Sequence, residues 1–325
     1  VDITLGAVKL PKTLREAYLN LSWTRVKATP LVTSDWEVAY DQFVLPVSKN
    51  SWSGKPGKAG NTTFVVDKST GALKSLCLDG EELLASPITL SLFRPATDND
   101  NRDQNGAKLW RQAGLDHLTQ KVVSLKEGKN KTTVKADILN VEGKKIGNAE
   151  FIYALNRDGS MKVQTTFEPD TSLVKSMARL GVTFEMKDTY ENVTYLGRGE
   201  HETYTDRNQS GKIGIYKTTP ERMFHYYVVP QSTGNRTDVR WLQLTDEHGK
   251  GCWIEANSLF QFSTVPFSDV ILEKARHINE LKRDGKITIH LDAEQAGVGT
   301  ATCGPGVLPS YLVPLTKQTF DVTIY

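Results

Sequence analysis

The chain has 325 residues, more than most single domains, so we expect one large domain together with a smaller one. Its 40 Lys and Arg residues nearly balance 38 Asp and Glu residues, and the net charge of +2 provides no electrostatic basis for binding nucleic acid or an anionic membrane. No apolar run approaches the roughly 20 residues that a membrane-spanning helix needs. Its three cysteines are widely spaced and form neither a disulfide framework nor a zinc-binding pattern.

The first 49 residues contain patterns typical of strands. Apolar and polar residues alternate in 17–23 and 36–40, and a third short run follows at 43–45. A segment of about 50 residues buries too little surface to close a sandwich of its own. The start at Val1 has neither an initiating Met nor the pattern of a signal peptide, so we expect an excised fragment, and its compartment is unknown from the sequence.

Residues 50–60 are rich in Gly, Pro and Ser, which predicts a linker. From 61 to 325, short strand patterns are separated by turn signals. The clearest signal is Asn156-Arg-Asp-Gly159, which predicts a hairpin between strands at 149–155 and 161–167.

Helical periodicity is limited to two stretches, 106–117 and 269–282, and each predicts a short helix. Many short strands with almost no helix are typical of a large all-β sandwich and not of alternating strands and helices. We therefore predict one all-β domain over residues 61–325.

Charged and aromatic side chains gather between residues 195 and 241. Glu202, Tyr204 and Asp206 alternate, so they would share one face of an extended segment, and three arginines, Arg207, Arg236 and Arg240, follow. Two interpretations stay open. The more frequent arrangement is a structural network of ion pairs that locks loops together, and the other is a polar surface that receives a sugar or another domain.

Three segments carry a resemblance to a known family. They are Phe93-Arg-Pro-Ala-Thr-Asp-Asn-Asp100 with Leu109-Trp-Arg-Gln-Ala-Gly114, then Gly197–Arg207 with Pro230–Trp241, and finally Gly297-Val-Gly-Thr-Ala-Thr-Cys-Gly-Pro305. In this order they resemble the C-terminal β-sandwich of LacZ-type β-galactosidases in glycoside hydrolase family two. The resemblance implies that 61–325 form a large antiparallel β-supersandwich similar to galactose mutarotase. It also implies that 1–49 are part of an immunoglobulin-like β-sandwich whose partner strands are missing.

The resemblance places two elements at the rim of an active site. The first is the loop that follows the first motif, with the candidate residues Asp98, Asn99, Asp100, Arg102 and Asp103. This loop looks shorter here than in the family, which leaves its closing motion open. The second is the turn at Cys303 and Gly304, where some members carry a tryptophan that stacks on the sugar. This chain has no Trp there, so any subsite for the leaving group should be weaker or differently shaped. The alternative for Cys303 is a small buried residue beside a Gly-Pro turn.

The charged segment fits the family as a structural network. The matching residues are Glu202, Tyr204, Asp206, Arg207, Gln231, Asn235 and Arg236. The chain departs from the family at Glu200, where proline is usual, at Thr203, where asparagine is frequent, and at Ser232, where glutamate is typical. These departures weaken the case for sugar contacts from this segment, but a scaffold role still fits.

We expect no catalytic residue in this chain. A glycosidase needs two carboxylates about 5 Å apart or wider. Two pairs of acids are candidates, Glu200 with Glu202 and Asp98 with Asp100. Acids in β-rich loops are mostly solvated or paired with Arg, and the family carries its catalytic glutamates on a barrel N-terminal to this region. We also expect no metal site, because His277 with Glu280 is a weak signal without a second His nearby.

The resemblance implies the C-terminal part of a β-galactosidase, which hydrolyses terminal non-reducing β-D-galactose residues. This part would pack on the catalytic barrel, complete the active-site rim and be inactive alone. We expect no cofactor in the chain, while Mg²⁺ and Na⁺ are used at the barrel of many members. The expected partners are a β-galactoside in the parent active site and the rest of the polypeptide; a homo-oligomer is left open, and no nucleic acid or membrane is expected.

Two alternatives remain. One is a free-standing carbohydrate-binding or aldose-epimerase-like module, which would need a complete first domain and a His/Glu pair in its cleft, and neither is identifiable in the sequence. The other is a purely structural role, which differs only in whether the 98–106 loop contacts sugar. The substrate also stays open, since family two includes glucuronidases and mannosidases.

Overall fold

The computed structural model describes residues 6, 10, 14, 16–47 and 60–325, and the chain divides into two compact units, Val1–Lys55 and Pro56–Tyr325. The predicted linker at 50–60 lies outside the described residues except for Gly60. In the described part of the chain, no helix has the length and apolar character needed to cross a membrane.

The first unit contains an antiparallel hairpin of β1 (Tyr18–Thr24) and β2 (Glu37–Val44), in which Tyr18 lies opposite Val44. The structure corrects the expected third strand. The runs at 36–40 and 43–45 belong to one strand, because the extended backbone continues through Asp41 and Gln42. The assignment of this hairpin to an immunoglobulin-like domain stays a prediction.

The second unit is almost entirely β. Its strands are β3 (Thr62–Val66), β4 (Leu73–Leu78), β5 (Glu81–Glu82), β6 (Thr89–Ser91), β7 (Thr119–Glu127), β8 (Lys131–Leu139), β9 (Lys145–Leu155), β10 (Met161–Pro169), β11 (Arg179–Lys187), β12 (Asn192–Gly199), β13 (Lys212–Thr218), β14 (Arg236–Thr245), β15 (Gly251–Val265), β16 (Lys286–Gln295) and β17 (Gln318–Ile324). The predicted hairpin is confirmed: β9 and β10 pair antiparallel from Leu155 and Met161 outward. Alternate residues of β10 are buried, as expected for a strand with one face on the core.

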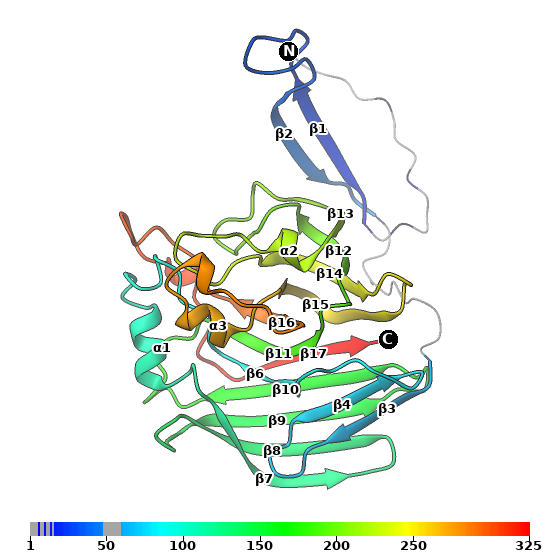
Figure 1. Cartoon of the computed structure of the whole chain (residues 1–325), viewed down its shortest axis with the longest axis vertical. Helices are drawn as coiled ribbons and strands as arrows, with labels where there is room; N and C mark the ends of the chain where they lie inside the picture. Colours follow the sequence, from blue (N-terminus) through cyan, green and yellow to red (C-terminus); the bar gives the residue numbers. More distant parts are fainter. Residues whose placement is uncertain (1–5, 7–9, 11–13, 15, 48–59) are drawn as a thin grey trace. The chain divides into compact units, whose positions relative to one another are not determined.

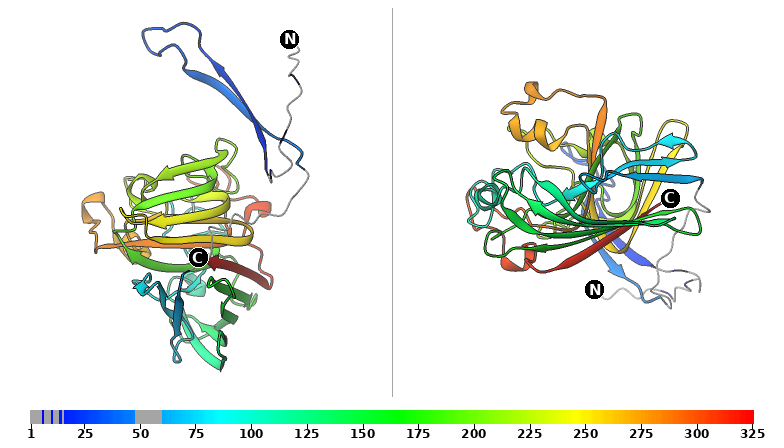
Figure 2. Two further views of the ribbon diagram at one scale, coloured as in Figure 1. Left: turned by 90° about the vertical axis from the view of Figure 1, so that its right-hand side faces the viewer. Right: turned by 90° about the horizontal axis from the view of Figure 1, so that it is seen from below.

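Within residues 60–325, twelve strands form one sheet and β3, β4 and β5 form a smaller one. The main path runs β13-β12-β14-β15-β17-β10-β9-β8-β7, and β16 pairs with both β15 and β11, which in turn pairs with β6. All of these pairings are antiparallel. Figure 1 shows β7 to β10 at one end of the sheet and β12 to β15 at the other, and Figure 2 shows how strongly the strands twist. The predicted all-β antiparallel class is confirmed.

The helices are short. α1 (Ala107–Ala113) lies inside the predicted stretch 106–117 and ends at Gly114, which adopts a left-handed conformation with φ 71°. α2 (Pro220–Met223) has Thr219 as its N-cap, and the 3₁₀ helices η1 (Ile278–Glu280) and η2 (Pro309–Tyr311) are single turns.

The helix predicted over 269–282 was too long. α3 (Asp269–Lys274) is capped by Ser268, whose hydroxyl accepts from the N–H of Ile271. The backbone becomes extended at Ala275, and Ile278 is exposed rather than buried, so the apolar periodicity does not continue along one helix face. α1 and α3 both lie on the left-hand side of the second unit in Figure 1. Arg111 of α1 and Glu273 of α3 form an ion pair at 2.6 Å.

Candidate functional site

The first and last sequence motifs meet around the buried side chain of Arg94. Its Nε and Nη2 donate to both carboxylate oxygens of Asp100, at 3.0 and 2.7 Å. The same guanidinium donates to the backbone carbonyls of Ala296, at 2.7 Å, and Gly297, at 2.8 Å. Burial alone would lower the pKa of Arg94, but the Asp100 carboxylate raises it more, so the guanidinium stays charged. Arg94 therefore ties residues 297–305 to residues 94–106.

Arg94 was not among the predicted site residues. The available signal is an arginine between Phe93 and Pro95 in an otherwise apolar run, where an uncompensated charge would be costly. Its ring neighbours are Trp110 and Tyr204, whose centroids lie 5.5 and 5.8 Å from the guanidinium carbon. These contacts extend the cluster from the first motif into the charged segment.

The loop that contains Asn99 and Asp103 is bonded to the C-terminal motif along its length. The Asn99 side-chain oxygen accepts hydrogen bonds from the N–H and the hydroxyl of Thr302. The nitrogen of the same amide donates to the carbonyl of Gly299 at 2.9 Å. Asp103 accepts from the N–H of Val307 at 2.6 Å and from the N–H of Asn105 at 2.8 Å. Together with the Arg94 contacts, these bonds make the two predicted rim elements one continuous structure.

The predicted rim residues divide by exposure. Asp100 and Asp103 are 2% and 7% exposed, and their carboxylates are occupied by partners within the chain. Asn99 is half-buried. The remaining members are all exposed: Asp98, Arg102, Cys303 and Gly304. The alternative of a buried Cys303 is therefore wrong, because this residue is exposed. It lies in a turn in which its N–H donates to the Thr300 carbonyl.

Glu202 is the centre of the charged segment. Its carboxylate accepts from the Arg207 guanidinium at 2.6 Å, the Tyr227 hydroxyl at 2.7 Å, the Thr233 hydroxyl at 2.8 Å and the Gly234 N–H at 2.9 Å. Burial would raise the pKa of Glu202, but these four donors outweigh it and hold the pKa below its usual value. Four donors on one carboxylate leave it little capacity to bind a ligand.

The expected shared face of Glu202, Tyr204 and Asp206 does not occur. The segment turns instead of extending, because Tyr204 and Arg207 exchange both of their backbone hydrogen bonds. Tyr204 is 2% exposed and lies between the guanidinium groups of Arg94 and Arg207. The Asp206 side chain is directed toward the C-terminal motif, where its carboxylate accepts hydrogen bonds from the backbone N–H groups of Val298 and Gly299.

The other network residues bond mostly to uncharged groups. Arg236 donates to the Tyr195 hydroxyl at 2.9 Å and to the backbone carbonyls of Glu200, Gly234 and Asn235. Asn235 donates to the Thr203 carbonyl and the Gln261 side chain, both at 2.9 Å, and Gln231 donates to the Val229 carbonyl at 3.1 Å. The arrangement is a scaffold of loops locked by hydrogen bonds, with Glu202 and Arg207 as its ion pair.

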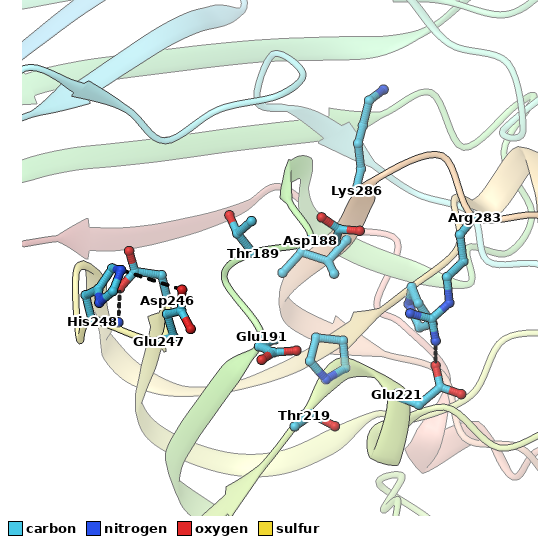
Figure 3. Close-up of a pocket in the computed structure, with 13 residues that line it drawn as sticks. Asp188, Thr189, Glu191, Thr219, Glu221, Asp246, Glu247, His248, Arg283 and Lys286 are labelled. Carbon is cyan, nitrogen blue, oxygen red and sulfur yellow. Dashed lines mark hydrogen bonds and ion pairs between the residues drawn. The ribbon is translucent and has the colours of Figure 1, made fainter.

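A surface cavity of about 550 Å³ lies apart from these residues, among the turns that follow β11 and β14. Figure 3 shows its charged wall, in which Arg283 pairs with Glu221 while Asp188, Glu191 and Lys286 line other sides. None of the predicted site residues lines it. Across the described residues, no three His, Cys, Asp or Glu side chains are grouped so that they could hold a metal ion.

Comparison with known proteins places most of the chain in one family. The family model described as beta galactosidase small chain matches residues 58–324. The chain is 30% identical over 304 residues to a beta-galactosidase of Priestia megaterium, with 87% of this chain and 29% of that protein aligned. It is 31% identical over 272 residues to a beta-galactosidase of Kluyveromyces lactis, which aligns 79% of this chain and 26% of that protein.

Among solved structures, the comparison matches a galactose 1-epimerase from Lactobacillus acidophilus NCFM, at 9% identity and a TM-score of 0.42 over 95% of this chain and 98% of that one. The chain spans less than a third of the length of the two beta-galactosidases named above. On the match of the family model to residues 58–324, the chain belongs to the beta galactosidase small chain family.

Proposed function

We propose that this chain is the part of a β-galactosidase that completes the rim of the active site and packs on a catalytic barrel elsewhere in the enzyme. The observation that carries the proposal is the joining of the 98–106 loop to the 297–307 segment through Arg94, Asn99 and Asp103. Sites built on rigidly held loops can place polar groups against a substrate with little loss of entropy.

The division by exposure assigns different roles to the rim residues. The exposed Asp98, Arg102 and Cys303 are available to contact a galactoside or the barrel. Asp100 and Asp103 are occupied internally and hold the loop in place. The absence of an aromatic side chain at Cys303 and Gly304 gives a subsite without a stacking face.

Neither candidate pair of acids suits hydrolysis. Asp100 is neutralised by Arg94, and Glu202 is saturated by four donors, so each pair lacks a second available carboxylate. We therefore expect the chain to be inactive alone, and the catalytic carboxylates to come from the barrel. Removal of terminal non-reducing β-D-galactose residues is the reaction that we propose for the whole enzyme.

The test uses a chimeric enzyme in which this chain replaces the matching region of the Priestia megaterium relative. A rim role predicts that Arg102→Ala lowers kcat/KM for a nitrophenyl β-galactoside by about tenfold or more, since charged hydrogen bonds to substrate are strong. The matched control is Lys108→Ala, an exposed cation on α1. Equal kcat/KM for both variants would reject the rim role and leave a role in assembly alone.

A further inference from the structure

A second cavity, of about 500 Å³, lies over strands β6 and β11 and within the size range of small-molecule sites. Its lining residues include Thr89, Ser91 and Thr183, which carry hydroxyl groups, together with Asp269 and Phe93. The Thr183 hydroxyl donates to the Ile289 carbonyl at 3.1 Å. None of the predicted rim or network residues lines it.

The strand register explains why polar groups collect here. Thr89 lies opposite Thr183, which lies opposite His290, so these three side chains form one row across β6, β11 and β16. Ser91, Gly181 and Asp292 form a second row two residues along. Because residues two apart on a strand share a face, both rows lie on the same side of the sheet.

The space over Gly181 in the second row is filled by its neighbours on β16. A Cβ atom at this position would lie 2.4 Å from the Asp292 carboxylate and 2.2 Å from the Leu291 carbonyl, so no side chain fits. The Asp292 carboxylate therefore lies over Gly181, and neither residue lines the cavity.

Several polar groups at this place have no partner. Ser91 is 6% exposed, and neither its hydroxyl nor that of Thr89 bonds to another residue in the described part of the chain. Gln120 also lines the cavity; its Oε1 is buried and lacks a hydrogen-bond partner, while its Nε2 donates to the Thr70 carbonyl at 3.0 Å. A buried amide oxygen without a partner is rare in folded proteins, and together with two unbonded hydroxyl groups among the lining residues it points to a ligand with several hydroxyl groups.

The charge of the wall favours a neutral ligand. Burial would raise the pKa of Asp269, but His290, whose Nε2 lies 3.1 Å from Asp269 Oδ1, and Arg179 lower it more, so Asp269 is ionised. Asp116 is a second acid on the wall, and neither Lys nor Arg lines it, so anions would be repelled. Phe93, with the leucines beside it, offers an apolar surface to the C–H face of a ring.

We propose that this cavity binds a small neutral polyhydroxylated ligand of the monosaccharide class. Its hydroxyl groups bond to Ser91, Thr89 and Asp269, and its apolar face lies against Phe93. The site is separate from the rim and does not depend on the catalytic barrel.

The test is an NMR titration of the ¹⁵N-labelled 325-residue chain with D-galactose and with D-glucose. We expect saturable shift changes at the amides of β6 and β11 with at least one of the two sugars. The double variant Ser91→Ala with Thr89→Val should weaken binding about fivefold or more, because it removes two hydrogen bonds to the ligand. Its Tm should be unchanged, since neither hydroxyl has a partner within the described chain.

Two controls make the result specific. Ser124→Ala, a serine substitution on β7 outside the cavity, should leave the affinity unchanged. D-glucuronate should bind at least about fivefold more weakly than D-glucose because of the two acids on the wall. The proposal is overturned if neither neutral sugar gives saturable shifts, if the shifts are confined to residues 98–106 and 300–305, or if the double variant binds as tightly as the unmodified chain.

Discussion

Asn99 holds Thr302 from a position 203 residues earlier in the chain: its Oδ1 accepts from the Thr302 N–H at 3.0 Å and from the Thr302 hydroxyl at 2.6 Å. The Nδ2 of the same amide donates to the Gly299 carbonyl at 2.9 Å. One side chain thus joins the two elements of the proposed rim. A substitution that breaks these hydrogen bonds in one element should therefore loosen the other element as well.

The first prediction follows from this joint. Asn99→Ala should speed hydrogen exchange at the amide of Thr302, because that N–H loses its acceptor. The matched control is Asn101→Ala, whose side chain donates within its own loop, to the Thr97 carbonyl, and accepts from Arg111. Equal protection of the Thr302 amide in both variants, measured by NMR, would show that the joint does not order the turn.

The second prediction concerns the buried pair of Arg94 and Asp100. Asp100→Ala leaves a buried guanidinium without its carboxylate, and should lower the free energy of unfolding by about 3–5 kcal/mol. Glu127→Ala, which breaks the exposed pair with Lys68, should cost no more than about 1 kcal/mol. Urea denaturation measures both. Similar losses in the two variants would contradict the role of Arg94 as the joining residue.

The third prediction concerns acid stability. The pKa of Glu202 in the folded chain lies below its ordinary value of 4.5, so its contribution to stability is complete above that pH and is lost as the pH falls through the folded pKa. Glu202→Gln should therefore be less stable than the unmodified chain at pH 7, and the difference should narrow below about pH 4.5.

Urea denaturation across the range from pH 7 to pH 3 measures that difference in the free energy of unfolding. The exposed Glu191→Gln variant serves as the control and should differ little from the unmodified chain at any pH. A difference for Glu202→Gln that stays constant over the whole range would contradict the assigned hydrogen bonds.

The fourth prediction separates the cysteines. Cys303 is exposed and should react with a thiol reagent in the folded chain, whereas Cys252 is buried and burial raises the pKa of its thiol to about 12. The exposed Cys303 should give a fast phase in the reaction with the thiol reagent, and Cys303→Ser should remove that phase. Cys252 should react only in denaturant. Cys77 is half-buried and its thiol donates to the Glu82 carboxylate at 3.5 Å, so we expect its reaction rate to lie between those of Cys303 and Cys252. A fast phase that survives in Cys303→Ser would contradict the exposed turn.

The fold class was predictable because alternation and turn signals are local. The hairpin of β9 and β10 follows from a four-residue turn, in which Gly159 has a φ of 86°. The length of α3 was not predictable, because Ile278 and Leu281 continue the helical spacing while the chain turns at Ala275. Tertiary contacts, not spacing, decided that boundary.

The candidate site was predictable only as a set of segments. The sequence places acids at Asp98, Asp100 and Asp103, but it does not tell which carboxylate faces outward, because that depends on Arg94 and on backbone N–H groups some two hundred residues away. The cavity beside Ser91 was not predicted either. Its lining residues, among them Ser91, Gln120 and Thr183, come from segments that are distant in sequence, so no local pattern marks it.

The most direct test of the proposed function is turnover of a nitrophenyl β-galactoside by the chain alone and by the chimera with the Priestia megaterium enzyme. We predict no turnover by the chain alone and clear turnover by the chimera, because the proposed function places the catalytic carboxylates in the other part of the enzyme. Turnover by the purified chain would contradict the account. So would a chimera that assembles to its native mass, measured by light scattering, yet fails to hydrolyse the substrate.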